Sequence, residues 1–407
     1  MEYQHTKLEN GLRLITIHRP GTRTVAARFY VRAGSRFDGG YPGLAHFTEH
    51  MLFEGTTSRA PRDIYTTIEA RGGEINAHTS REYISVHTLT LTDDLPLALD
   101  LLGDIILNPG LSDESFQEEK LVVLNEIQGA RDQSGVLYDL FLQNLWLQNP
   151  LRNPILGTVE GLRDLDVATL HGFYKNRFVS GNALLVICGD VPLEEMLRLA
   201  KKTFDDSPTG IEQPPEPVDE PALTEPRGTH VEKDIHRTHM LLGVPTVGLK
   251  HPGRSALKVI ELILGMGGSG RLYQRLREEL GLVYAINTVS SVYEDAGFLG
   301  VRAVCAPENL TAVQDAILDE WADLRESGIS KGELAAAKGN YTGTLTRRFE
   351  TNLSVAGIFG IEGLLYQVEP FEQAIARING VTRGGVQEAA QRYLNEDGYV
   401  LVTMGSR

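Results

Sequence analysis

Cysteine is nearly absent from this 407-residue chain, which contains only Cys188 and Cys305. Each lies in an apolar, strand-like run in a different half of the chain, so we expect two buried thiols rather than a disulfide or a metal site. The longest apolar runs are far shorter than the roughly 18–20 residues that a membrane-spanning helix needs. The opening residues, MEYQHTKLENG, lack an apolar signal region. We therefore expect a reducing compartment, no membrane partner and no export, which favours a cytoplasmic protein.

Positive charge is also in short supply. The chain has 39 Lys and Arg residues against 54 Asp and Glu residues, and its formal net charge is −15. Such a chain repels nucleic acids and anionic membranes and favours neutral or basic partners. A hydrophobic content of 42% and a charged content of 23% are those of an ordinary globular protein. The length exceeds that of one typical domain and fits two domains of about 200 residues each.

A proline-rich stretch divides the chain near its middle. Residues 207–226 contain six prolines and five acidic residues but no Lys or Arg, which predicts an extended linker. Residues 1–206 and 227–407 show a similar succession of strands and helices, and each half closes on a helix followed by an apolar strand (183–191 and 399–404). We therefore predict an α+β fold of two homologous domains related by internal duplication, each a mostly antiparallel sheet packed by helices.

The most informative stretch is GLAHFTEHMLFE, Gly43–Glu54, for which we predict a helix that ends before Gly55. His46, Glu49 and His50 would project from one face of that helix, within about 100° of arc. Two imidazoles placed in this way can bind one metal ion, and the carboxylate beside them can move a proton on a water. The spacing could also arise by chance on a solvated helix. The apolar flanks argue against that alternative, because they predict a buried helix in which unpartnered polar groups are costly.

A second stretch, SDESFQEEKLVVLNEIQG, predicts a helix over residues 112–129, beginning at a Ser112 N-cap. Glu119 and Glu126 are seven residues apart and therefore share a face. They could be metal-site residues or ordinary solvated charges. The expected buried stripe of this helix comprises Phe116, Leu121, Leu124 and Ile127.

In these two stretches and in two others, the chain resembles the pitrilysin-type (inverzincin) zinc metallopeptidases. The similarity is greatest to two-domain members such as the catalytic subunit of mitochondrial processing peptidase and its bacterial homologues. The matching stretches span both halves in the same order: RAGSRFDGGYPGLAHFTEHMLFEGT, IEARGGEINAHTSREY, SFQEEKLVVLNEIQ and GSGRLYQRLREELGLVYAI.

The resemblance implies one Zn²⁺ per chain, held by His46, His50 and Glu126. These three ligands would leave the fourth tetrahedral position open for water. Glu119 would contact a ligand and orient it. Glu49 would be the general base that takes a proton from the attacking water and passes it to the leaving amine. The second half has no H-x-x-E-H sequence, so we assign the metal chemistry to the first half.

The resemblance also implies a peptide-binding site. Asn76 and Ala77 would lie on a sheet edge to which the substrate adds as a β-strand. Arg277 and Tyr284 match the pair that holds substrate and stabilises the developing oxyanion in this family. The alternatives are an ordinary strand at Asn76 and Ala77, a surface Arg277 and a core Tyr284.

With these residues in place, the resemblance implies a zinc metalloendopeptidase that acts on unfolded peptides or leader segments inside a chamber formed by two chains. In two-domain relatives the Arg/Tyr pair reaches the zinc site of the other subunit. This chain has both residue sets, which favours a homodimer over a heterodimer with a homologous chain. The alternative function is a non-catalytic peptide-binding or assembly subunit. Such members have degraded metal motifs, whereas the motif here is intact.

Overall fold

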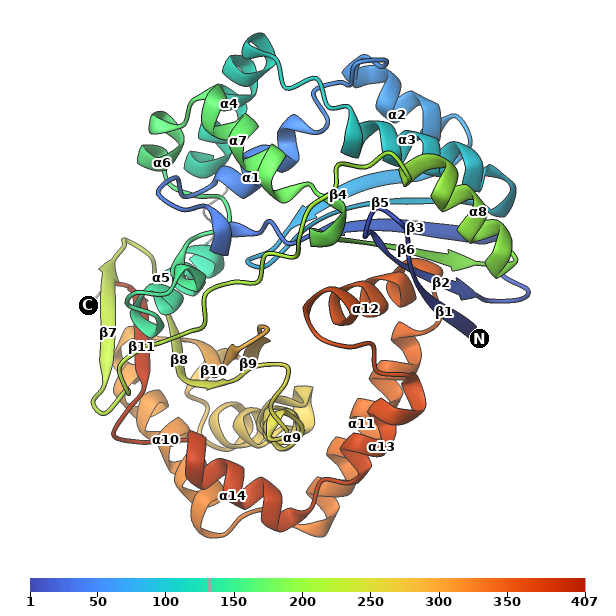
Figure 1. The fold of residues 1–407 in the computed structure, drawn as a ribbon. Coiled ribbons are helices and arrows are strands. Elements are labelled where there is room, and N and C mark those ends of the chain that lie inside the picture. Colours follow the sequence, from blue (N-terminus) through green and yellow to red (C-terminus); the bar gives the residue numbers. More distant parts are fainter. Residues whose placement is uncertain (130–132, 407) are drawn as a thin grey trace. The chain divides into compact units, whose positions relative to one another are not determined.

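The computed structural model describes residues 1–129 and 133–406, which form two compact units (Figure 1). Each unit is assembled from three separate segments of the chain. Within the described residues, unit 1 comprises 1–129, 153–216 and 348–368, and unit 2 comprises 133–152, 217–347 and 369–406.

Unit 1 is built on a six-stranded sheet with the order β1-β2-β6-β3-β5-β4. All neighbouring strands are antiparallel except β2 and β6, which are parallel. Every residue of β6 is buried, as its unbroken apolar sequence ALLVICG predicts for an interior strand. The strands are β1 (Glu2–Lys7), β2 (Arg13–His18), β3 (Thr24–Val31), β4 (Glu74–Thr79), β5 (Ile84–Leu91) and β6 (Ala183–Gly189).

Most helices of unit 1 cover one face of this sheet, whereas α12 lies on the opposite face against β3 and β6 (Figure 1). The helices on the first face enclose the main core with β2, β3, β5 and β6. The helices of unit 1 are α1 (Leu44–Met51), α2 (Pro61–Glu69), α3 (Leu95–Leu107), α4 (Asp113–Gly129), α6 (Val159–Asp164), α7 (Val167–Arg177), α8 (Leu193–Phe204) and α12 (Asn352–Leu365).

Unit 2 has a five-stranded sheet with the order β7-β11-β8-β10-β9, in which only β7 and β11 are parallel. The sheet of unit 1 without β1 has the same chain order, spatial order and strand directions. This shared topology confirms the predicted α+β fold and its internal duplication. The strands are β7 (Arg227–Glu232), β8 (Thr238–Val247), β9 (Val283–Val292), β10 (Ala296–Cys305) and β11 (Val400–Gly405).

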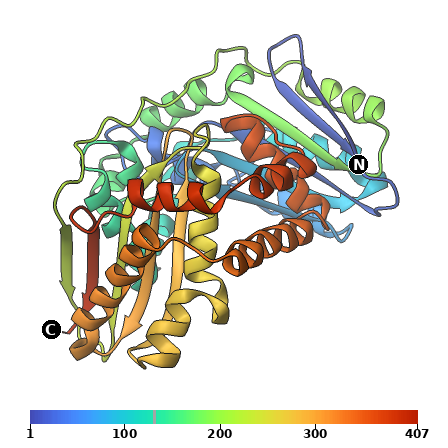
Figure 2. The same ribbon diagram turned by 90° about the horizontal axis from the view of Figure 1, so that it is seen from below.

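One face of the second sheet packs against α9, α10 and α14, and α14 contacts both of the other helices (Figure 2). The other face packs against α5 through a separate apolar core that contains Phe141, Trp146 and Phe298. The helices of unit 2 are α5 (Gln133–Leu145), α9 (Arg254–Gly265), α10 (Leu310–Glu326), α11 (Lys331–Arg348), α13 (Phe371–Asn379) and α14 (Arg383–Tyr393).

The two halves of the sequence therefore exchange one helix each: α12 covers the sheet of unit 1, and α5 covers the sheet of unit 2. Hydrogen bonds hold α12 in place, including one from the Tyr30 hydroxyl to the Gly357 carbonyl (3.2 Å) and one from Arg32 to the Leu364 carbonyl (2.7 Å). Residues 207–226 contain no helix or strand, and they pass from unit 1 to unit 2 after Glu216. The compact units thus differ from a single division of the chain at this linker.

Several local expectations needed correction. Helix α1 ends at Met51, three residues before the expected limit next to Gly55. The buried residues of α4 are Phe116, Val123 and Ile127, whereas Leu121 is 64% exposed, so the predicted stripe was wrong at Leu121. The two cysteines are buried and free, as predicted.

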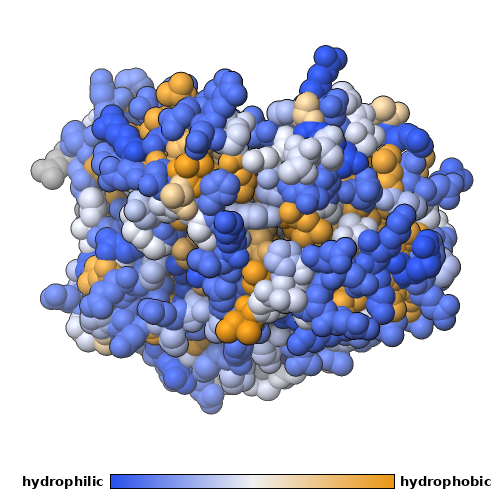
Figure 3. Space-filling model, turned by 45° about the horizontal axis from the view of Figure 1, so that its top comes forward, coloured by the Kyte–Doolittle hydropathy of each residue, from blue (hydrophilic) through white to orange (hydrophobic). Residues whose placement is uncertain are grey.

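In the described part of the chain, no helix combines the length and apolar character needed to cross a membrane. On the face shown in Figure 3, hydrophilic residues predominate and apolar residues gather only in small groups.

Candidate metal centre and peptide-binding edge

Helix α1 begins at a tightly held turn. Gly43 precedes the helix with a φ of 103°, a left-handed conformation that favours glycine. The buried Asp38 carboxylate accepts hydrogen bonds from the backbone N–H groups of Gly43 (2.7 Å) and Ala45 (2.8 Å). Asp38 thus satisfies N–H groups that the first turn of a helix leaves unpaired, and it fixes where α1 starts.

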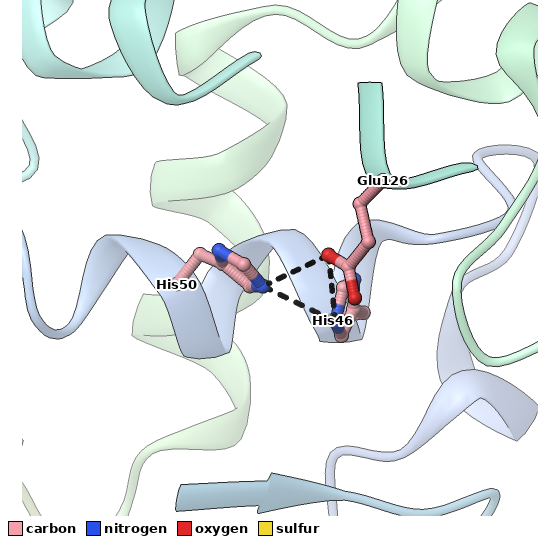
Figure 4. Close-up of side chains that lie close together, drawn as sticks. All are labelled: His46, His50 and Glu126. Atoms are coloured by element: carbon pink, nitrogen blue, oxygen red, sulfur yellow. Dashed lines mark hydrogen bonds and ion pairs between the residues drawn. The ribbon is translucent and has the colours of Figure 1, made fainter. Parts of the chain in front are cut away.

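The side chains of His46, His50 and Glu126 converge between α1 and α4 (Figure 4). The two histidine Nε2 atoms are 3.2 Å apart. The Glu126 Oε2 atom lies 3.5 Å from Nε2 of His50 and 3.9 Å from Nε2 of His46. Helix α4 therefore brings a carboxylate to two imidazoles that are one helical turn apart on α1.

These three atoms suit a single metal ion. Tetrahedral ligands about 2.1 Å from zinc are separated by roughly 3.4 Å, which is close to the three distances in this cluster. Without a cation, a contact between the two Nε2 atoms requires a proton on one of them. Nδ1 of His46 is buried and has no hydrogen-bond partner among the described residues, so nothing there fixes the protonation of that ring. The donor set and its spacing both fit zinc.

Glu119 contacts Nδ1 of His50, the ring nitrogen that does not face the other two side chains of the cluster. Its Oε1 atom lies 2.6 Å from Nδ1 of His50, so this nitrogen donates its proton to the carboxylate. The Nε2 lone pair of His50 is then directed at His46 and Glu126. Such carboxylate–histidine contacts orient ligands and strengthen metal binding.

The surroundings affect the two histidines in opposite directions. Burial, aided by the charge of His50, lowers the pKa of His46 to about 3. Burial also lowers the pKa of His50, but the hydrogen bond and charge of Glu119, with the charges of Glu126 and Glu49, outweigh it. The pKa of His50 is therefore raised above its ordinary value.

Glu49 lies on α1 between the two histidines in sequence, and its carboxylate is held by the end of β4. The Thr79 hydroxyl donates a hydrogen bond to Oε2 of Glu49. Burial raises the pKa of Glu49, while the hydrogen bonds from Thr79 oppose this rise. A carboxylate in this environment, next to a cluster of candidate metal ligands, has a position suited to a general base.

Strand β4 is the outermost strand of its sheet, and Asn76 and Ala77 lie on it. The N–H of Ser80 bonds to the Tyr83 carbonyl (2.8 Å), which directs Ser80 toward β5. Because backbone groups alternate along an antiparallel ladder, those of Ala77 and Thr79 face away from β5, along the free edge. The Ala77 N–H is bonded to Oδ1 of Asn76 (2.8 Å). This edge has the backbone groups that an added strand requires.

Arg277 and Tyr284 lie in unit 2, each at a backbone irregularity. Arg277 belongs to a π-helix over Tyr273–Glu279, and such turns are frequent at functional sites. Tyr284 is the extra residue of a β-bulge, because Val304 pairs with Ala285 and Cys305 pairs with Val283. A bulge redirects its side chain, and Tyr284 is 49% exposed rather than buried in the core.

Sequence reasoning missed three residues near these features: Asp38, Thr79 and Arg237. The Arg237 guanidinium lies 4.1 Å from the centre of the Tyr284 ring. Asp38 lies five residues before Gly43, which is too far for the N-cap rule to indicate it. Thr79 and Arg237 act through partners distant in sequence, and no local pattern marks them.

Comparison with known proteins gives a consistent set of similarities. The family model described as "Insulinase (Peptidase family M16)" matches residues 13–159, and the one described as "Peptidase M16 inactive domain" matches residues 164–341. An uncharacterized zinc protease of Mycobacterium leprae is 33% identical over 396 residues, covering 96% of this chain and 89% of the relative.

Solved structures share the fold. A protease from Helicobacter pylori matches with a TM-score of 0.93 and 21% identity, covering 99% of both chains. A chain in the structure of Complex III2 from Candida albicans matches with a TM-score of 0.85 and 19% identity, covering 99% of this chain and 95% of that one. At these identities the two structures support the fold and carry no argument about activity.

Proposed function

The chain belongs to peptidase family M16, and from this premise we propose that it is a zinc-dependent metalloendopeptidase. One observation carries the proposal: His46, His50 and Glu126 present three ligand atoms within 4.8 Å of one another, on two helices of one unit. Glu49 and the free edge of β4 lie beside this cluster. Its relative in Mycobacterium leprae bears the name zinc protease, which agrees with the donor set.

In this proposal His46, His50 and Glu126 hold one Zn²⁺, and Glu119 orients His50. When bound, the ion supplies Lewis acidity that activates water and polarises the scissile carbonyl. Glu49 takes the proton from the attacking water and delivers it to the leaving nitrogen. Its raised pKa suits this exchange, because a base with a pKa nearer neutrality can both accept and return a proton.

The proposed substrates are unfolded peptides or leader segments that add to β4 as an extra antiparallel or parallel strand. Ala77 would pair with the substrate backbone, and Asn76 would release the Ala77 N–H that it now binds. Recognition through backbone groups favours extended chains over folded proteins and depends little on substrate side chains.

Arg277 and Tyr284 complete the proposal as donors to the developing oxyanion. We propose that they act on the metal centre of a second copy of the chain, which makes the active species a homodimer. A heterodimer with a homologous chain is the alternative assembly. Both residues are exposed in unit 2, as this role requires.

A non-catalytic binding or assembly subunit is the competing function. The intact cluster of His46, His50 and Glu126 favours the peptidase, because a binding subunit does not need an aligned set of metal ligands. The presence of Glu49 beside the free edge of β4 also favours the peptidase.

The test is cleavage of a mixed pool of quenched peptides by the purified chain alone, with and without a zinc chelator. We expect chelator-sensitive cleavage that returns when zinc is restored. Glu49→Gln is the matched control: it should bind zinc with the wild-type stoichiometry and lose nearly all turnover. Undiminished cleavage by Glu49→Gln would contradict the role of Glu49. A wild-type chain that neither binds zinc nor cleaves would favour the non-catalytic alternative.

A further inference from the structure

We infer that Thr79 is a positioning residue that holds Glu49 in its catalytic orientation and marks the end of the peptide-binding edge. This inference rests on the proposed function, and it extends the site to a residue outside both metal motifs.

The contact joins a strand to a helix. Thr79 is the last residue of β4 and is only 4% exposed. Its hydroxyl donates a hydrogen bond to Oε2 of Glu49 on α1. A carboxylate held in this way keeps one orientation, which a general base needs for efficient proton transfer.

The same contact limits how a peptide can pair with β4. Glu49 lies against Thr79, the residue at which β4 ends. An added strand that pairs with Ala77 therefore meets the Glu49 carboxylate at Thr79. Glu49 lies where this backbone pairing stops, so the strand register, rather than a side-chain pocket, brings one substrate peptide bond to the base.

The test compares Thr79→Val with Thr79→Ser. Valine keeps the β-branched shape and removes the hydroxyl, whereas serine keeps the hydroxyl and removes a methyl group. The matched control is Thr88→Val on β5, because Thr88 is also buried and its Oγ1 has no hydrogen-bond partner in residues 1–129 and 133–406. All variants are made in the full chain and loaded with zinc.

We expect Thr79→Val to lower kcat by about 10- to 100-fold with little change in KM, because the base is misaligned while the peptide edge remains. Thr79→Ser should recover most of that loss, and Thr88→Val should behave like wild type. Zinc stoichiometry, and the visible spectrum after replacement by Co²⁺, should be the same in all variants, since no metal ligand is changed.

A second measurement needs no activity. In metal-free protein, the unfolding free energies of Thr79→Val, Glu49→Gln and the double variant form a double-mutant cycle. We expect the two changes to be non-additive, whereas Thr88→Val and Glu49→Gln should add.

The outcomes separate this inference from the proposed function. If wild type cleaves peptides and Thr79→Val has an unchanged kcat, the positioning role is overturned while the peptidase stands. A loss of kcat that Thr79→Ser does not recover, or that Thr88→Val shares, also overturns it. If wild type cleaves nothing, the double-mutant cycle decides alone, and additivity of Thr79→Val and Glu49→Gln would overturn the contact whatever the outcome for the proposed function.

Discussion

His50 shows how neighbouring groups determine what one side chain can do. Glu119 accepts the proton of its Nδ1 at 2.6 Å, which leaves Nε2 as the lone-pair donor beside His46 and Glu126. In an isolated neutral imidazole either ring nitrogen can carry the proton, so either one can present the lone pair. The contact with Glu119 therefore selects the tautomer that suits a metal ligand.

This contact leads to a prediction for Glu119→Gln. A neutral amide still accepts a hydrogen bond from Nδ1 but no longer stabilises the positive charge that His50 gains on coordination. We expect zinc affinity to fall by about 10- to 100-fold, measured by competition with a chromophoric chelator. Glu118→Gln, at the adjacent exposed position, is the control and should retain wild-type affinity. Equal affinities for the two variants would exclude the orienting role of Glu119.

A pH dependence of zinc binding follows from the two histidine pKa shifts. Below the raised pKa of His50 the metal-free ring is protonated, and zinc must displace that proton. Zinc affinity should therefore rise with pH by about one log unit per pH unit below this pKa and level off above it. His46, with a pKa of about 3, is already neutral in this range and adds nothing to the slope.

The measurement is a series of zinc titrations between about pH 5 and 8, where histidine ordinarily titrates. The transition should lie above the ordinary histidine pKa of 6.5. An affinity that stays constant across the series, or that falls as pH rises, would refute this assignment.

At the scale of elements, α12 depends on a close approach to the sheet of unit 1. A Cβ atom added at Gly360 would lie 2.0 Å from Cε2 of Tyr30, whose ring is fully buried. The ring cannot withdraw easily, because its hydroxyl is bonded to the Gly357 carbonyl on the same helix. The absence of a side chain at Gly360 is therefore a packing requirement.

We predict that Gly360→Ala lowers the free energy of unfolding by about 1–3 kcal/mol, as expected for overpacking of a close contact. Gly343→Ala is the matched control, because Gly343 lies in α11 and an added Cβ meets nothing within 4 Å. There alanine should stabilise the protein by up to about 1 kcal/mol through its higher helix propensity. Urea denaturation of both variants gives the comparison. Stabilisation by both alanines would contradict the packing account.

At the scale of the whole molecule, the duplication has separated two sets of residues. The counterpart of α1 in unit 2 is α9, which joins the corresponding strands but has the sequence RSALKVIELILG, without histidine. The counterpart of β4 is β9, which carries Tyr284. Unit 1 thus holds the proposed metal-ligand set and unit 2 the Arg277/Tyr284 pair.

If the two sets act between chains, inactive variants should complement each other. Mixing Glu49→Gln with Arg277→Ala under conditions of subunit exchange should restore about a quarter of wild-type activity, since half of the dimers would be mixed and each would have one intact site. Mixing Glu49→Gln with Glu126→Gln is the control and should restore none, because both changes affect unit 1. The readout is peptide cleavage after exchange has been verified. No recovery for the first pair would count against action between chains.

The sequence by itself determined the features that depend on near neighbours. The spacing of His46, Glu49 and His50 places them on one side of α1 because an α-helix repeats every 3.6 residues, and the same rule relates Glu119 to Glu126. The alternation of strands and helices, the apolar run of β6 and the matching end of the second half also predicted the duplicated α+β fold. These signals are local, so they can be interpreted from the sequence without knowledge of how the rest of the molecule folds.

Only the tertiary structure decided which distant groups meet. Helix α12 covers the first sheet and α5 covers the second because each sheet must bury both of its faces. Any apolar helix could cover such a face, so the sequence alone does not show which helix covers which sheet. The exposure of Leu121 depends on which side of α4 contacts other helices, which its mixed sequence leaves open. The hydrogen bond from the Thr79 hydroxyl to Glu49 joins residues thirty positions apart. Contacts of this kind depend on how complete elements pack in three dimensions, and hydrophobic periodicity along the chain does not specify that packing.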